Sequence, residues 1–130
     1  MDEYMSRKAG VWGLICPGSP EEVARARRWT RDVLREHPRV DDVVLVVSEL
    51  GTNALTHTVG DALRVTLTVT EGRVTVAVTD SGGTPEIPRA VEAGEAALHG
   101  RGLSIVMTLA TSLAVTGDEA GRTVTAELPW

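Results

Sequence analysis

Aromatic residues and cysteine are both scarce in this chain of 130 residues. Phenylalanine is absent, and the tyrosine and tryptophan residues are limited to Tyr4, Trp12, Trp29 and Trp130. A core must therefore be built mainly from valine, leucine, alanine and isoleucine. The single cysteine, Cys16, excludes an internal disulfide and a CxxC metal site, so we expect a small buried apolar side chain in a reducing compartment.

Long apolar runs and an excess of positive charge are also missing. No apolar run reaches the length of a membrane span, and the N-terminal MDEYMSRKAG has no apolar signal-peptide region, so we expect a cytoplasmic protein with no membrane partner. The formal net charge of -5 argues against direct nucleic-acid binding, which requires a basic surface. The composition predicts one soluble domain over residues 11–130, preceded by a flexible tail over 1–10.

The first half of the chain predicts a strand followed by two helices. VWGLIC is typical of a short strand, and Ser19 is expected to cap a helix that runs to about Glu36, with Glu22 in capping-box position. The run DDVVLVV alone would suit a buried strand. Its continuation to Thr58 favours a helix, because apolar residues recur with a 3.6-residue period at Val43, Val47, Leu50 and Ala54.

The second half predicts two hairpins separated by a long loop and a helix. ALRVTLTVT and RVTVAVTD alternate cleanly around a turn at Glu71-Gly72. The segment 81–100 is expected to be a mobile loop with a partial helix, followed by a helix over Gly102–Thr111 and a closing hairpin. This order indicates an α+β fold, a two-layer sandwich with an antiparallel or mixed sheet and helices on one face.

Three motifs carry chemistry. In SELGTNALTH, helical spacing places Glu49, Asn53 and His57 on one face. A carboxylate can accept a proton and an amide oxygen suits Mg²⁺. Taken alone, this row is better explained by a solvated helix face.

The other two motifs contain glycine. In VTDSGGTP, a strand ends at Asp80, whose carboxylate can accept a hydrogen bond from an exocyclic amine such as that of adenine, while glycines allow a flat ring to approach. In HGRGLSIV, Gly-Arg-Gly leads into an apolar helix, which favours binding of phosphate. A turn and a flexible junction are the alternatives for each motif alone.

Taken in order, these motifs resemble those of the GHKL superfamily of ATP-binding proteins. Within it, the chain is similar to the single-domain anti-sigma-factor serine/threonine kinases of actinobacteria. The resemblance extends from about Leu14 to Leu128. ELGTNALTH resembles the N-box, VTDSGG and HGRGLSIV the two glycine boxes, and GRTVTAEL the terminal strand whose threonine assists adenine recognition.

The resemblance implies a role for each matched residue. Glu49 would be the general base and Asn53 the direct protein ligand of Mg²⁺. Asp80 would accept a hydrogen bond from the adenine amine. Gly82 would make room for the ring, and Thr123 would support adenine recognition through its hydroxyl or a water molecule.

The resemblance also implies how the ATP phosphates are held. They would lie against Gly100, Arg101 and Gly102 while a lid over about 84–99 closes. Two positions depart from the family pattern: Gly51 lies inside the N-box helix, where a larger apolar residue is usual, and Thr84 replaces the second glycine of the first box.

Two functions follow from the resemblance. The first is an ATP-dependent kinase that phosphorylates an anti-anti-sigma (STAS-type) partner and regulates a sigma factor by partner switching. The alternative is a catalytically weak binding module whose nucleotide only shapes a partner-binding surface. The catalytic half of a histidine kinase is disfavoured, because no helical segment with a phosphoacceptor histidine precedes the domain. The resemblance also allows a homodimer, since family members commonly dimerise.

Overall fold

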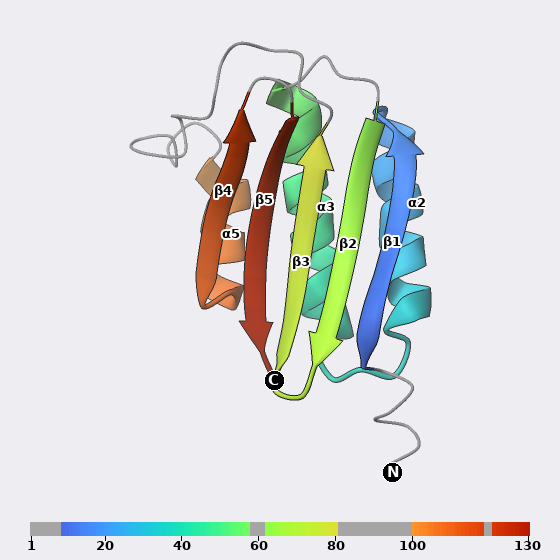
Figure 1. Ribbon diagram of the computed structural model, residues 1–130, viewed down its shortest axis with the longest axis vertical. Helices are drawn as coiled ribbons and strands as arrows, with labels where there is room; N and C mark the ends of the chain where they lie inside the picture. The colour runs from blue at the N-terminus through green and yellow to red at the C-terminus, as the bar shows by residue number, and fades with distance from the viewer. Residues whose placement is uncertain (1–8, 58–61, 81–99, 119–120) are drawn as a thin grey trace.

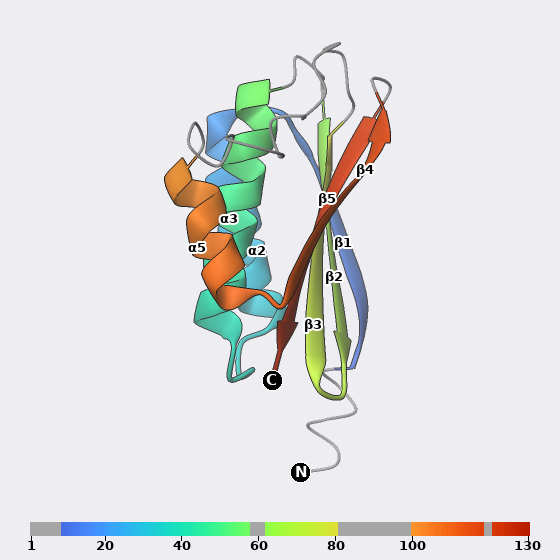
Figure 2. The ribbon, with the colours of Figure 1, turned by 90° about the vertical axis from the view of Figure 1, so that its left-hand side faces the viewer.

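A computed structural model describes residues 9–57, 62–80, 100–118 and 121–130. In these residues an antiparallel five-stranded sheet forms one layer and three helices form the other, as Figure 2 shows. The predicted α+β two-layer fold is therefore confirmed. In chain order the elements are β1 (Gly10–Pro17), α2 (Pro20–Val33), α3 (Val40–His57), β2 (Ala62–Thr70), β3 (Arg73–Asp80), α5 (Gly100–Leu109), β4 (Ser112–Asp118) and β5 (Gly121–Pro129).

The sheet has the strand order β1-β2-β3-β5-β4, visible in Figure 1, and every neighbouring pair is antiparallel. The predicted hairpin between β2 and β3 is confirmed with the expected boundaries. Its register pairs Thr70 with Arg73, which leaves Glu71 and Gly72 to turn the chain. Gly72 has a φ of 92°, a left-handed conformation that glycine adopts without a steric penalty. The loop predicted over 81–100 lies outside the described residues except for Gly100.

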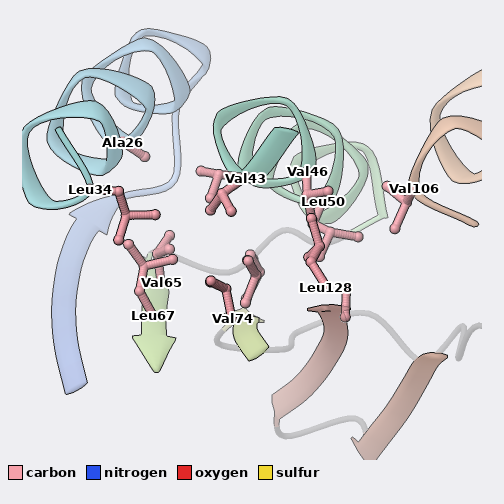
Figure 3. Packing of buried hydrophobic residues seen from close by; sticks show 14 of the residues in the cluster. Ala26, Leu34, Val43, Val46, Leu50, Val65, Leu67, Val74, Val106 and Leu128 are labelled. Atoms are coloured by element: carbon pink, nitrogen blue, oxygen red, sulfur yellow. The ribbon is translucent and has the colours of Figure 1, made fainter. Parts of the chain in front are cut away.

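The ambiguous valine-rich segment folds as helix α3, as its 3.6-residue period predicted. Val43, Val46 and Leu50 face the sheet and are almost completely buried. Figure 3 shows these side chains between the helices and the buried residues of β2, β3 and β5. Among the described residues, no helix is long and apolar enough to cross a membrane.

Helix α2 ends earlier than the sequence predicts and begins without its expected side-chain cap. Ser19 is the N-cap, but its side chain makes no capping hydrogen bond; only its carbonyl accepts the N–H of Glu22, at 2.9 Å. At the other end, Leu34 leaves the helical conformation and is fully buried. His37 is also buried, with its ring edge against Trp130 at a centroid distance of 4.3 Å. Because these two side chains are buried, the chain leaves the helical conformation before the predicted end at Glu36.

Helix α5 begins and ends two residues before the predicted boundaries. The backbone N–H of Thr111 donates to the carbonyl of Glu127 in β5, at 2.8 Å, so the chain has already joined the sheet there. A pairing between distant segments therefore sets the end of α5, and a local pattern cannot reveal it.

Candidate functional site

The described elements that carry the predicted site residues meet at one end of the molecule, uppermost in Figure 1. Helix α3 ends there, β3 ends there at Asp80, and α5 and β5 begin there. Helix α3 packs against both β3 and α5. The tertiary fold thus brings three motifs that are separated along the chain to neighbouring places.

Glu49 and Asn53 lie on the flank of α3 that faces away from α2. The α2 flank is marked by Ser48, whose hydroxyl accepts a hydrogen bond from Arg27 at 3.2 Å, and by Gly51, which lies against Val23. Since each helical residue turns the direction by about 100°, Glu49 and Asn53 project from the other side of the helix, toward α5. Both are half-buried.

Asp80 is the last residue of β3 and continues its buried face. Val74, Val76 and Val78 point toward the helices, and Asp80 follows at the same two-residue interval with 5% of its surface exposed. A carboxylate in this position is an acceptor at the end of an otherwise apolar face of β3.

Arg122 lies directly opposite Asp80 in the register of β3 and β5. Its Nε atom is 3.5 Å from Asp80 Oδ2, and the side chains are 8% and 4% exposed, so this is a buried ion pair. Arg122 was not predicted from the sequence, although the alternation of buried and partly exposed residues along β5 indicates its position. Ala126 and Leu128 are buried on the helix side, and the two-residue period places Arg122 on that side too.

Thr123, in contrast, lies on the other face of the sheet. Its hydroxyl is 2.8 Å from the hydroxyl of Thr79, the residue opposite it in register. The structure therefore pairs Thr123 with Thr79 on the face of the sheet opposite Asp80, and the role of Thr123 in adenine recognition stays a prediction. In a strand, neighbouring residues lie on opposite faces, so Arg122 and not Thr123 shares the face of Asp80.

The backbone of Gly100, Arg101 and Gly102 forms the first turn of α5. The N–H groups of a first helical turn have no partner within the helix and are suited to bind an anion. The side chain of Arg101 lies outside the described residues, as do Gly82, the predicted lid over 84–99 and the side chain of His57.

The available donors fit magnesium held mainly by a nucleotide. Among the residues that the structure describes, no cluster of three or more histidine, cysteine, aspartate or glutamate side chains could hold a metal ion. Mg²⁺ in nucleotide sites commonly takes one or two protein oxygens and completes its shell with phosphates and water. The half-buried amide of Asn53 is compatible with such a site.

A separate hollow of about 380 Å³ lies between α2 and α3. It is on the α2 flank of α3 and therefore apart from Glu49 and Asn53. Its lining is formed by Pro20, Val23, Ala24, Arg27, Thr52 and Leu55.

Fold and site together define a two-layer α+β domain with a candidate ligand site at one end of its sheet. The chain belongs to the histidine kinase-like ATPase domain family, whose model matches residues 16–128. This membership confirms the resemblance to the GHKL superfamily. No curated protein matches the chain.

Two solved structures have a similar fold. A chain of the SiaB–SiaC complex from Pseudomonas aeruginosa is 14% identical, with a TM-score of 0.61, and the alignment covers 100% of this chain and 96% of that one. The histidine kinase domain of the blue-light activated histidine kinase from Erythrobacter litoralis EL346 is 22% identical, with a TM-score of 0.54. The alignment covers 87% of this chain but only 61% of the histidine kinase domain.

Proposed function

We propose that this protein binds MgATP and transfers the γ-phosphoryl group to a serine or threonine of an anti-anti-sigma (STAS-type) partner, thereby regulating a sigma factor. One observation carries the proposal. β3 ends with the buried carboxylate of Asp80 at the same end of the molecule where α5 begins and where α3, the helix of Glu49 and Asn53, ends. Membership of an ATPase domain family supports a nucleotide as the ligand.

Each part of the nucleotide has a chemically matched group at this end. Asp80 accepts a hydrogen bond from the exocyclic amine of adenine. The first turn of α5, at Gly100, Arg101 and Gly102, supplies N–H groups to the phosphates. Asn53 holds Mg²⁺, which neutralises phosphate charge when bound. Gly82 and the lid over 84–99 retain their predicted roles in this proposal.

Glu49 acts as the general base for the attacking hydroxyl. It lies one helical turn before Asn53 on the same flank of α3, so base and metal ligand face the same space. Phosphoryl transfer requires mainly positioning and charge neutralisation, together with a group that orients the nucleophile.

The binding module without phosphotransfer remains the second candidate. The departure at Gly51 does not favour this candidate, because Gly51 lies on the α2 flank and outside the proposed site. The similarity to a chain of a two-protein complex supports regulation through a partner under either candidate. The STAS-type partner, the sigma factor and the homodimer stay predictions.

Nucleotide binding is tested by calorimetry with MgATP. We expect saturable binding to the wild-type protein and a loss of affinity of about tenfold or more in Asp80→Asn, because an amide is a weaker acceptor for the amine than a carboxylate. Asp32→Asn, at an exposed position of α2, is the control and should bind as the wild type does. Circular dichroism establishes that each variant is folded. Equal heats in Asp80→Asn and wild type would contradict the assigned role of Asp80.

Phosphotransfer is tested separately with γ-labelled ATP and the anti-anti-sigma protein encoded nearest to the gene. We expect label on a serine or threonine of that protein and a rate about 100-fold lower in Glu49→Gln, the usual scale for loss of a general base. Glu21→Gln, exposed in the first turn of α2, is the control. ATP binding without transfer to any candidate partner would support the binding module.

A further inference from the structure

The pair formed by Asp80 and Arg122 is unusual for its depth. The two residues face each other across β3 and β5 and point into the layer occupied by the helices. Their side chains are only 4% and 8% exposed. Removing two charges from water carries a large desolvation cost, and apolar residues of similar size often stabilise a core at least as well. Stability alone therefore does not account for an arginine at this position.

The contact between Arg122 Nε and Asp80 Oδ2 is long for an arginine–carboxylate hydrogen bond. The Nε–Oδ2 distance is 3.5 Å, whereas charge-assisted hydrogen bonds of this type are commonly about 2.7–2.9 Å. The two side chains present an acceptor group beside a donor group at the end of the sheet where the base is proposed to bind. Aspartate only accepts hydrogen bonds, and arginine offers five N–H donors in a planar fork.

Building on the proposed function, we propose that Arg122 reads the adenine ring together with Asp80. The guanidinium donates a hydrogen bond to the ring nitrogen N1, while Asp80 accepts one from the neighbouring exocyclic amine. This edge of adenine carries a donor next to an acceptor, which complements an acceptor next to a donor on the protein. Arg122 thereby takes the place in base recognition that the sequence assigned to Thr123, whose hydroxyl faces the other side of the sheet.

The test measures which atom of the base forms a hydrogen bond with each residue. Calorimetry compares MgATP with 1-deaza-ATP, in which a C–H group replaces N1, and with purine riboside triphosphate, which lacks the exocyclic amine. In the wild-type protein each analogue should bind about tenfold or more weakly than ATP, because a hydrogen bond to a charged group is lost.

Variants then assign the two losses to their residues. In Arg122→Met the ratio of the 1-deaza-ATP and ATP dissociation constants should fall toward one, while the penalty for the missing amine should persist through Asp80. A purely structural role for Arg122 would weaken ATP and 1-deaza-ATP equally and leave that ratio unchanged. Arg73→Met is the matched control, since Arg73 is exposed at the opposite end of β3.

Several outcomes would overturn the inference. Wild-type affinities that are equal for ATP and 1-deaza-ATP would do so even if Arg122→Met fails to fold. An unchanged ratio of the 1-deaza-ATP and ATP dissociation constants in a folded Arg122→Met protein would also overturn it. Tighter ATP binding by that variant would do the same, because it would mean that Arg122 competes with the base for Asp80. Tighter binding of GTP than of ATP would exclude adenine as the base. Absence of any ATP binding by the wild type would reject the proposed function itself, a result distinct from the others.

Discussion

At the scale of single residues, Gly51 illustrates how a departure from a family pattern can lie outside the site. Gly51 is buried in the middle of α3, on the flank that meets α2. A Cβ atom there would lie 3.5 and 3.7 Å from the two methyl groups of Val23, which is ordinary van der Waals contact. The backbone does not require glycine either, since Gly51 is helical.

We therefore expect Gly51→Ala to stabilise the protein. Alanine loses less conformational entropy than glycine in a helix and should raise the free energy of unfolding by about 0.5–1 kcal/mol, measured by urea denaturation. Gly72→Ala is the control: Gly72 has the left-handed φ of 92° and open space around it, so alanine there should cost about 1–2 kcal/mol of backbone strain. A destabilised Gly51→Ala protein would mean that α2 and α3 pack more tightly than this geometry indicates.

At the scale of elements, Arg39 connects the start of α3 with the ends of α5 and β5. It lies just before α3, and its Nε donates to Asp42 in the first turn of α3 at 2.9 Å. One Nη atom donates to the carbonyl of Leu109 at the end of α5, at 3.4 Å, and the other to the carbonyl of Pro129 at the end of β5. A single guanidinium thus holds two helix ends to the end of a central strand.

Loss of this connection should destabilise the whole layer of helices. For Arg39→Met we expect the free energy of unfolding to fall by about 2 kcal/mol, because several charge-assisted hydrogen bonds are lost and carbonyl groups lose a donor. The comparison variant is Arg31→Met. Arg31 also pairs with an aspartate of α3, Asp41, but the two side chains are 56% and 84% exposed, so the change should stay below about 0.5 kcal/mol. Equal effects of the two variants in chemical denaturation would contradict this role for Arg39.

At the scale of the whole molecule, the buried thiol of Cys16 makes stability depend on pH. It lies on β1 with 1% of its surface exposed, between the sheet and the start of α2. Burial raises the pKa of the Cys16 thiol, the carboxylate of Glu22 raises this pKa further, and Arg25 lowers it in part. The thiol becomes accessible when β1, an edge strand, separates from α2 and β2.

Stability should consequently decrease at alkaline pH. A thiol whose pKa is raised by folding is neutral in both states below its ordinary pKa of about 8.5, so it does not lower the free energy of unfolding there. Above that pH the unfolded chain ionises first, so the free energy of unfolding falls as pH rises toward the folded pKa. Urea denaturation from pH 7 to pH 10 should show a steeper decline in wild type than in Cys16→Ala. Parallel curves would show that folding does not perturb the thiol.

Local patterns in the sequence determined which segments are helices and strands and which motifs carry chemistry. The two-residue alternation of β2 and β3 and the 3.6-residue period of α3 are properties of neighbouring residues, so they can be read without a fold. Asp80 was recognised for the same reason, because strand and glycines are adjacent to it in the chain.

Only the tertiary structure decided which groups meet. The pairing of Asp80 with Arg122, the placement of Thr123 on the far face and the early end of α2 all depend on contacts between distant segments. The physical reason is that strand register fixes the face of every side chain, and register is set by the partner strand and the packed core. The sequence alone therefore indicates the chemistry of the candidate site, and the fold determines its geometry.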